Sequence, residues 1–101
     1  MLNNKQTCQL IAKSYRMSIG IIREHENGYH RLLQKEIEPH YHIVNRVNEV
    51  VEGLDILEGL IIENEIIKGK KDNWYIDFLS YSTYKRHVDK AYSEFLKNLE
   101  D

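Results

Sequence analysis

The sequence lacks the features on which disulfide-bonded, secreted and membrane-spanning proteins depend. Cys8 is the only cysteine, so no disulfide can form within the chain, and a lone thiol suits a reducing, intracellular compartment. The longest run of purely apolar residues has three members, as at 60–62, whereas a membrane-spanning helix needs about 20. Residues 1–9 are polar and contain no secretory hydrophobic segment. We therefore expect a cytoplasmic protein that makes no contact with a membrane.

Catalytic and cofactor-binding patterns are also missing. The sequence has no glycine-rich phosphate loop and no Ser or Cys in a nucleophile motif. Its five histidines include two close pairs, His25 with His30 and His40 with His42. Zinc ligands on a helix are typically four residues apart on one face, and neither pair has that spacing. We expect no enzymatic activity, no metal site and no cofactor, and we interpret the histidines as solvated or packing residues.

Proline and strand-like patterns are scarce, which favours a helical domain. The chain has one proline and no useful length of alternating apolar and polar residues. With 101 residues, of which 42% are hydrophobic and 30% charged, it is large enough for one modest core. We predict an all-α, four- to five-helix domain spanning 1–101, with a helical part at 1–67 and a C-terminal helix-turn-helix at 68–101.

The first predicted helix runs from about Thr7, a candidate N-cap, to Glu26, just before an Asn27-Gly28 pair of the kind that ends helices. It is apolar on two sides. One stripe comprises Cys8, Ile11, Ala12, Tyr15, Ile19 and Ile22, and the second comprises Leu10, Met17 and Ile21. The second stripe is either buried within the chain or shared with a partner. With this dimerisation surface in the N-terminal part, we predict a homodimer.

The middle of the chain combines its one proline with a long apolar repeat. Residues 29–38 fit a short helix, and Pro39 fits the first turn of a new one, because an interior proline loses a hydrogen bond and clashes. Apolar residues then recur at alternating spacings of four and three from Ile43 to Ile61, as in a coiled coil or helical hairpin. Gly53 costs a helix about 1 kcal/mol relative to alanine, so a break near it is expected. We interpret the carboxylates of this region as a solvated face: Glu49, Glu52, Asp55, Glu58, Glu63 and Glu65.

The charges are unevenly distributed along the chain. The formal net charge is −2, which by itself argues against binding to nucleic acid. Residues 1–35 nevertheless carry six Lys or Arg against two acids, and residues 68–99 carry seven against four, whereas residues 36–67 carry one against eight. Because nearby charges govern the field at a surface more than the total does, the two basic ends are suited to an anionic partner.

The stretch from Asp72 to Phe95 contains the clearest functional pattern. Ser80 is a favourable N-cap between a short helix over 73–79 and a longer second helix. The second helix places Tyr84, Val88, Ala91, Phe95 and Leu99 on one face, and Ser82, Arg86, Lys90, Ser93 and Lys97 on the other. Such a helix can pack on its own domain through the first face and meet a phosphate backbone through the second.

The same stretch contains a family resemblance. It reads Leu79-Ser80-Tyr81-Ser82-Thr83-Tyr84-Lys85-Arg86, followed by Lys90-Ala91-Tyr92 and Phe95-Leu96. This run resembles the end of phage transcriptional regulators of the ArpU and RinA type, which are similar in turn to the DNA-reading C-terminal domain of sigma factors. Residues 57–67 and Trp74 resemble the preceding helix and the first element of that group. The resemblance implies a DNA-binding transcriptional regulator of phage or prophage origin.

The resemblance also implies roles for individual residues on double-stranded DNA. The second helix would lie in the major groove with its N-terminal residues on base edges. The residues nearest the DNA would be Tyr81, Ser82, Thr83, Lys85, Arg86 and Lys90. Phosphates would be held by Lys68, Lys70, Lys71 and Lys97, which fix register without reading sequence. A transcription-machinery protein is a further candidate partner.

A second interpretation belongs to a different class of protein. The acidic stretch from Glu36 to Glu65 would suit a small interaction module, or a phage-derived inhibitor or adaptor, that meets a basic protein surface.

Overall fold

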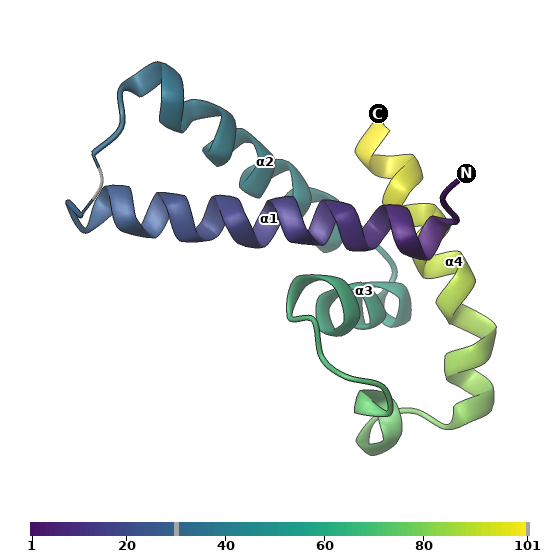
Figure 1. The fold of residues 1–101 in the computed structure, drawn as a ribbon. Helices are drawn as coiled ribbons and strands as arrows, with labels where there is room; N and C mark the ends of the chain where they lie inside the picture. The colour runs from purple at the N-terminus through teal and green to yellow at the C-terminus, as the bar shows by residue number, and fades with distance from the viewer. Residues whose placement is uncertain (30, 101) are drawn as a thin grey trace.

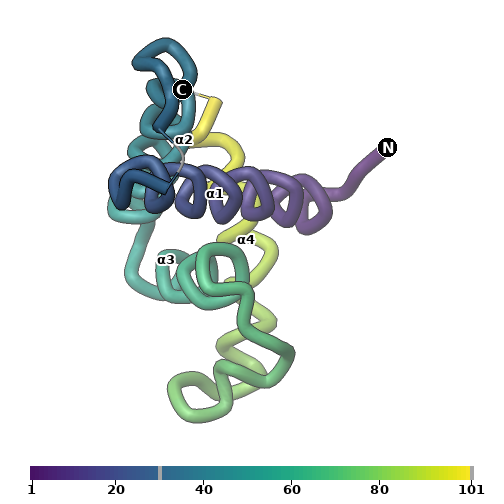
Figure 2. The backbone as a smooth tube through the Cα atoms, turned by 60° about the vertical axis from the view of Figure 1, so that its left-hand side comes forward, coloured from purple at the N-terminus to yellow at the C-terminus, as the bar shows by residue number. Residues whose placement is uncertain are grey.

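The computed structural model describes residues 1–29 and 31–100. Along the chain they form α1 (Asn4–Glu26), α2 (Gln34–Glu52), α3 (Ile56–Ile62), the π-helical η1 (Glu63–Ile67), the 3-10-helical η2 (Trp74–Asp77) and α4 (Tyr81–Glu100). Within these residues there are four α-helices and no strand, so the all-α prediction is confirmed. In Figures 1 and 2, α1 lies between α2 and α3, and α4 crosses near the N-terminal end of α1. No helix in this part of the chain combines the length and apolar character needed to cross a membrane.

The first helix begins earlier than predicted. Asn3 is the N-cap of α1, because its side chain accepts a hydrogen bond from the N–H of Gln6 at 2.8 Å, and the Gln6 side chain accepts one from the N–H of Asn3 at 3.0 Å. The prediction of Thr7 as N-cap is wrong, since this reciprocal capping box satisfies two N–H groups and leaves Thr7 in the helix. The predicted end is confirmed: α1 stops at Glu26, and Gly28 follows with a φ of +80°.

The prediction of a short helix over 29–38, followed by a new one at Pro39, is wrong, although residue 30 itself lies outside the described residues. α2 is continuous from Gln34 and contains Pro39 within it. Its start is fixed upstream, where the N–H of Leu33 donates to the carboxylate of Glu36 at 2.9 Å. Ile37 in the next position is 1% exposed. Capping and the burial of Ile37 together outweigh the one hydrogen bond that Pro39 removes.

The apolar seam from Ile43 to Ile61 is divided between two helices. α2 ends at its C-cap Gly53, and α3 begins at Ile56, so the expected break is confirmed. Val47 and Val50 before the break and Ile61 after it are all buried. The seam therefore supplies one core from two directions instead of forming a continuous coiled coil.

The two stripes of α1 have different environments. The first is core: Cys8, Ala12, Tyr15 and Ile22 are buried, and Ile11 and Ile19 pack partly buried against them. In the second, Leu10 is 55% exposed and Met17 56% exposed, while Ile21 is partly buried. The second stripe is therefore not enclosed within the chain.

Two arginines fix helix ends against neighbouring helices. Arg16 of α1 donates from Nη1 to the carbonyl of Ile66 in η1 at 2.7 Å. Arg46 of α2 donates from Nη2 to the carbonyl of Asn98 near the end of α4, also at 2.7 Å. Because helix C-termini leave carbonyls unpaired and partly negative, a guanidinium is a favourable partner there. These bonds hold η1 against α1 and the end of α4 against α2.

Candidate nucleic-acid interface

The C-terminal unit consists of the loop 68–73, η2, the turn 78–80 and α4. The loop ends at Asn73, which has a left-handed φ of +72°. The sequence predicted a short helix over 73–79, but the structure has one 3-10 turn of four residues there. So few residues between a left-handed Asn73 and the cap of the next helix cannot complete an α-helical nucleus. The unit is a 3-10 turn joined to a long helix, and a helix-turn-helix in the strict sense is not shown.

Ser80 caps α4, as predicted. Its Oγ accepts a hydrogen bond from the N–H of Thr83 at 3.2 Å and donates to Oγ1 of Thr83 at 2.9 Å. The apolar phase of the helix is also confirmed, with Ala91 and Phe95 fully buried. Thr83, expected at a base edge, is instead partly buried and occupied by the cap. The first turn of α4 is therefore rigid, and its other side chains are presented from a fixed backbone.

Glu65 ties η1 to both parts of the C-terminal unit. Its Oε2 accepts hydrogen bonds from Nε1 of Trp74, at 2.8 Å, and from the hydroxyl of Tyr84, and its Oε1 accepts from the hydroxyl of Tyr92. Burial and the bonds to Glu65 raise the pKa values of the Tyr84 and Tyr92 hydroxyls well above the ordinary range. The carboxylate thus joins η2 and two turns of α4 to the helix that precedes them.

Aromatic rings pack η2 against the first turn of α4. Tyr75 stacks on Tyr84 with ring centroids 4.1 Å apart and an interplanar angle of 11°. Trp74 meets Tyr84 edge to face at 6.2 Å. The ring of Phe78, by contrast, is 60% exposed. The rings of Trp74 and Tyr75 thus pack on the first turn of α4 and hold η2 against it.

A second carboxylate, Glu58, joins α3 to the middle of α4. It is 3% exposed and lies 3.3 Å from Nδ1 of His87 and 3.4 Å from Nζ of Lys90. Burial alone raises the pKa of Glu58, but hydrogen bonds from the backbone and His87 and the charge of Lys90 outweigh it, so the pKa lies below the ordinary value. Lys90 also lies 3.9 Å from Asp55. Its charge is therefore largely compensated within the chain, which makes it a poor phosphate ligand.

The interpretation of the central carboxylates as a wholly solvated face is wrong for Glu58 and Glu65. Both sit at heptad-like spacing with the buried Ile61, on the side of the chain that faces the core. That spacing was the available signal, because a carboxylate on a core stripe needs partners within the fold. The rings and the lysine that supply those partners lie far along the sequence.

The remaining predicted contacts of α4 are open to solvent. Tyr81 is 61% exposed, and Ser82, Lys85 and Arg86 are exposed as well. The ammonium of Lys85 lies 5.9 Å from the centroid of the Tyr81 ring, a cation–π distance. Among the residues that the structure describes, neither Lys85 nor Arg86 takes part in a salt bridge. Their charges are available to an anionic partner.

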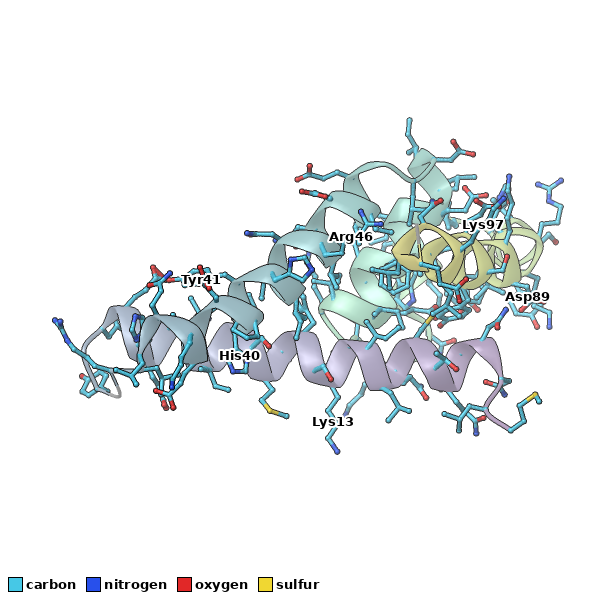
Figure 3. All side chains as sticks on the ribbon, turned by 90° about the horizontal axis from the view of Figure 1, so that it is seen from above. Lys13, His40, Tyr41, Arg46, Asp89 and Lys97 are labelled. Atoms are coloured by element: carbon cyan, nitrogen blue, oxygen red, sulfur yellow. The ribbon has the colours of Figure 1, made fainter. Side chains whose placement is uncertain are left out.

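The four predicted phosphate ligands do not lie together. Lys68, Lys70 and Lys71 are exposed in the loop 68–73, next to η2. Lys97 is exposed near the other end of α4, and Figure 3 shows it beside the end of that helix. At a rise of about 1.5 Å per residue it lies roughly 16 Å along the helix from Arg86. Of the four, only the loop lysines are close to the first turns of α4 in the sequence.

An acidic residue that the sequence analysis did not single out lies on the same exposed face. Asp89 follows Lys85 by one turn and lines, with Lys5 of α1, a groove beside Tyr81 and Lys85. Its negative charge would oppose a phosphate placed at this point. Asp89 therefore limits how far along α4 an anionic partner is attracted.

Two histidines besides His87 make specific bonds within the fold. His40 Nδ1 lies 2.9 Å from the hydroxyl of Ser18, and His25 Nδ1 accepts a hydrogen bond from the N–H of Leu32 at 3.0 Å. Across 1–29 and 31–100, no three His, Cys, Asp or Glu side chains are grouped so that they could hold a metal ion; His30, predicted as unable to pair with His25 on zinc, lies outside those residues. Comparison with protein-family models, with curated proteins and with solved structures found no match to the chain.

Proposed function

We propose that this protein is a DNA-binding transcriptional regulator that uses the first turns of α4 as its reading surface. The proposal rests on one observation: in the C-terminal unit, one set of residues fixes the backbone and another set remains exposed. Glu65, the Ser80 cap and the stacked rings fix the backbone, while Tyr81, Ser82, Lys85 and Arg86 remain exposed. A rigid helix end with free polar and cationic side chains is what reading of the major groove requires.

The roles of the exposed residues follow from their chemistry. Arg86 lies on the side of α4 opposite the buried stripe, and a guanidinium there suits a bidentate contact with guanine O6 and N7. Lys68, Lys70 and Lys71 beside η2 suit the neighbouring phosphates, because an ammonium binds them as a point charge. The residue pattern at 79–96, similar to phage regulators, supports the same assignment. The proposal involves no catalytic step and no cofactor.

The test compares two variants on two DNAs. Binding of the full chain to labelled duplex from its own locus, and to a scrambled duplex of equal composition, is followed by fluorescence anisotropy at several salt concentrations. Arg86→Ala should weaken the locus duplex by about 1–3 kcal/mol more than the scrambled one. Lys70→Ala should weaken both alike and reduce the slope of log K against log salt by about one.

Lys35→Ala is the matched control, because Lys35 is an exposed cation at the start of α2, away from the C-terminal unit (Figure 1). It should bind both duplexes as the parent does. Lys90 is unsuitable as a phosphate probe, since its removal would also unpair the buried Glu58. Parental affinity in both test variants, or no DNA binding at low salt, would overturn the proposal. A protein recovered with the chain in that case would favour the adaptor interpretation, with the exposed Glu49 and Glu52 as its first candidates for contact.

A further inference from the structure

An apolar groove lies at the side of α1 that faces away from α3. It has a volume of about 370 Å³. Its lining comes from three helices: Leu10, Ile11 and Ser14 of α1, His42, Ile43, Arg46 and Val47 of α2, and Leu99 of α4. The second apolar stripe of α1 adjoins it, with Leu10 and Met17 each more than half exposed. We call the stripe formed by Leu10, Met17 and the partly buried Ile21 the ridge. One continuous surface thus contains both a ridge and a groove.

The two sides of this surface differ in charge. On α1, Lys13 is exposed and projects on the side away from α2, as Figure 3 shows. Arg16 and Lys5 face elsewhere, because Arg16 is bonded to Ile66 of η1 and Lys5 lines the groove beside Tyr81 and Lys85. On the far wall of the groove, α2 carries the carboxylates Glu36, Glu38, Glu49 and Glu52 against Lys35 and Arg46, and all four carboxylates are exposed. The ridge side therefore has the positive charge of Lys13, whereas the groove side has the four carboxylates of α2.

We propose that a second copy of this chain covers this surface, with a twofold axis parallel to α1 between the ridge and the groove. An isologous interface places the same patch on both partners, so each projection must find its recess in the other copy. This axis sets the ridge of each copy over the groove of the other. It also sets Lys13 of α1 opposite the carboxylates of α2. A twofold axis perpendicular to α1 would instead oppose ridge to ridge and cation to cation.

The charges also separate a second copy from other occupants. An anionic peptide, a nucleic acid or an acidic membrane surface would be attracted by Lys13 but would meet the four exposed carboxylates of α2. A second copy presents both signs in reciprocal order. In Figure 1 the first turns of α4 lie on the α3 side of α1, whereas this surface includes Leu99, near the end of α4 on the α2 side, so pairing leaves the first turns open. The dimer does not depend on DNA binding.

Sedimentation velocity of the full chain without DNA tests the proposal. The parent should form a dimer at tens of micromolar, and Leu10→Glu should raise the dissociation constant at least tenfold. Ile56→Glu is the matched control, because Ile56 is 89% exposed and lies at the start of α3, outside the ridge and the groove. Both variants should retain the parental circular dichroism, since neither side chain is buried. A parent that stays monomeric at several hundred micromolar overturns the proposal, as does a dimer that Leu10→Glu leaves intact.

The orientation has two tests of its own. Ser14 lies on α1 and also lines the groove, so it is nearest the proposed axis, where a residue meets its own counterpart. Ser14→Cys should form an intermolecular disulfide on mild oxidation, whereas Ser93→Cys, exposed on α4, should not; the native Cys8 is fully buried. Lys13→Glu and Glu49→Lys should each weaken the dimer, and the double variant should recover most of the loss. Equal cross-linking at both cysteines, or no recovery in the double variant, contradicts this axis.

Discussion

Replacing Glu65 with alanine should destabilise the C-terminal unit, because three ring donors would lose the acceptor that they share. The indole N–H of Trp74 and the hydroxyls of Tyr84 and Tyr92 all bond to this carboxylate. Hydrogen bonds to a charged group contribute about 1.5–3 kcal/mol each when buried. Since Glu65, Trp74 and Tyr84 are only partly buried, water can satisfy part of what is lost. We therefore expect a total loss of about 3–5 kcal/mol in the free energy of unfolding.

The Glu65→Gln variant separates the contribution of the charge to stability from that of the number of hydrogen bonds. In Glu65→Gln, the amide oxygen can still accept the bonds from Trp74 and Tyr84, and the amide N–H₂ can donate to the hydroxyl oxygen of Tyr92. What is lost is the charge assistance, so we expect about 1–2 kcal/mol. A domain of this size shifts its melting temperature by roughly 4–8 °C for each kcal/mol, which makes the two variants distinguishable.

The chain provides its own local probe for this experiment. Trp74 is the only tryptophan, and its indole is one of the three donors. Urea titrations followed by tryptophan fluorescence and by circular dichroism should shift to lower urea for Glu65→Ala, while Glu52→Ala, which removes an exposed carboxylate from α2, should match the parent. If Glu65→Ala lies within about 0.5 kcal/mol of Glu52→Ala, the ring bonds do not anchor the unit.

Three further predictions concern the core, acid stability and the reading surface. Phe95→Ala should cost about 3–5 kcal/mol in urea titrations, because the ring is fully buried, whereas Phe78→Ala, at an exposed ring, should cost little; equal effects would refute the packing of α4. Glu58 has a pKa held below its ordinary value of about 4.3, so its stabilising contribution is complete above that pH and is lost as the pH falls through the lower value in the folded state. Glu58→Gln should therefore flatten the fall in unfolding free energy as the pH is lowered below the ordinary pKa of a glutamate. An unchanged acid titration of stability would show that its partners do not stabilise the carboxylate. Asp89→Asn should tighten binding to any duplex at low salt in the anisotropy assay, by removing a charge that opposes phosphate, and unchanged affinity would place the DNA elsewhere.

Helix identity and phase were predictable because they depend on local periodicity. The stripe through Ala91 and Phe95 of α4, the core stripe of α1 and the break at Gly53 all followed from spacings of three and four and from helix-ending residues. Boundaries were less predictable. Asn3 displaced Thr7 as the N-cap through a reciprocal bond with Gln6, and α2 runs through Pro39, because the helix is capped at Leu33 and Ile37 is buried. Each depends on a competition between local terms of about 1 kcal/mol.

The candidate site was predictable only in part. The exposed face of α4 with Arg86 follows from a helical wheel, and so does the cap at Ser80. A helical wheel cannot show whether Lys90 is free, because its partner Glu58 precedes it by 32 positions and meets it only when α3 packs on α4. The role of Glu65 could not be predicted either, because its three ring partners come from other positions in the sequence and meet it only in the folded chain.

By itself, the sequence determined an all-helical chain with one buried face on α4 and a basic, exposed face on its first turns, because apolar periodicity and capping act over a few residues. Tertiary packing decided which charges are free. It enclosed Glu58 and Glu65 among donors from α4 and η2, paired Lys90 with Glu58, and left Lys85, Arg86, Leu10 and Met17 in solvent. The position of a charged residue in the sequence does not show which partner it will have. The partner is brought to it by helices that pack through their apolar faces.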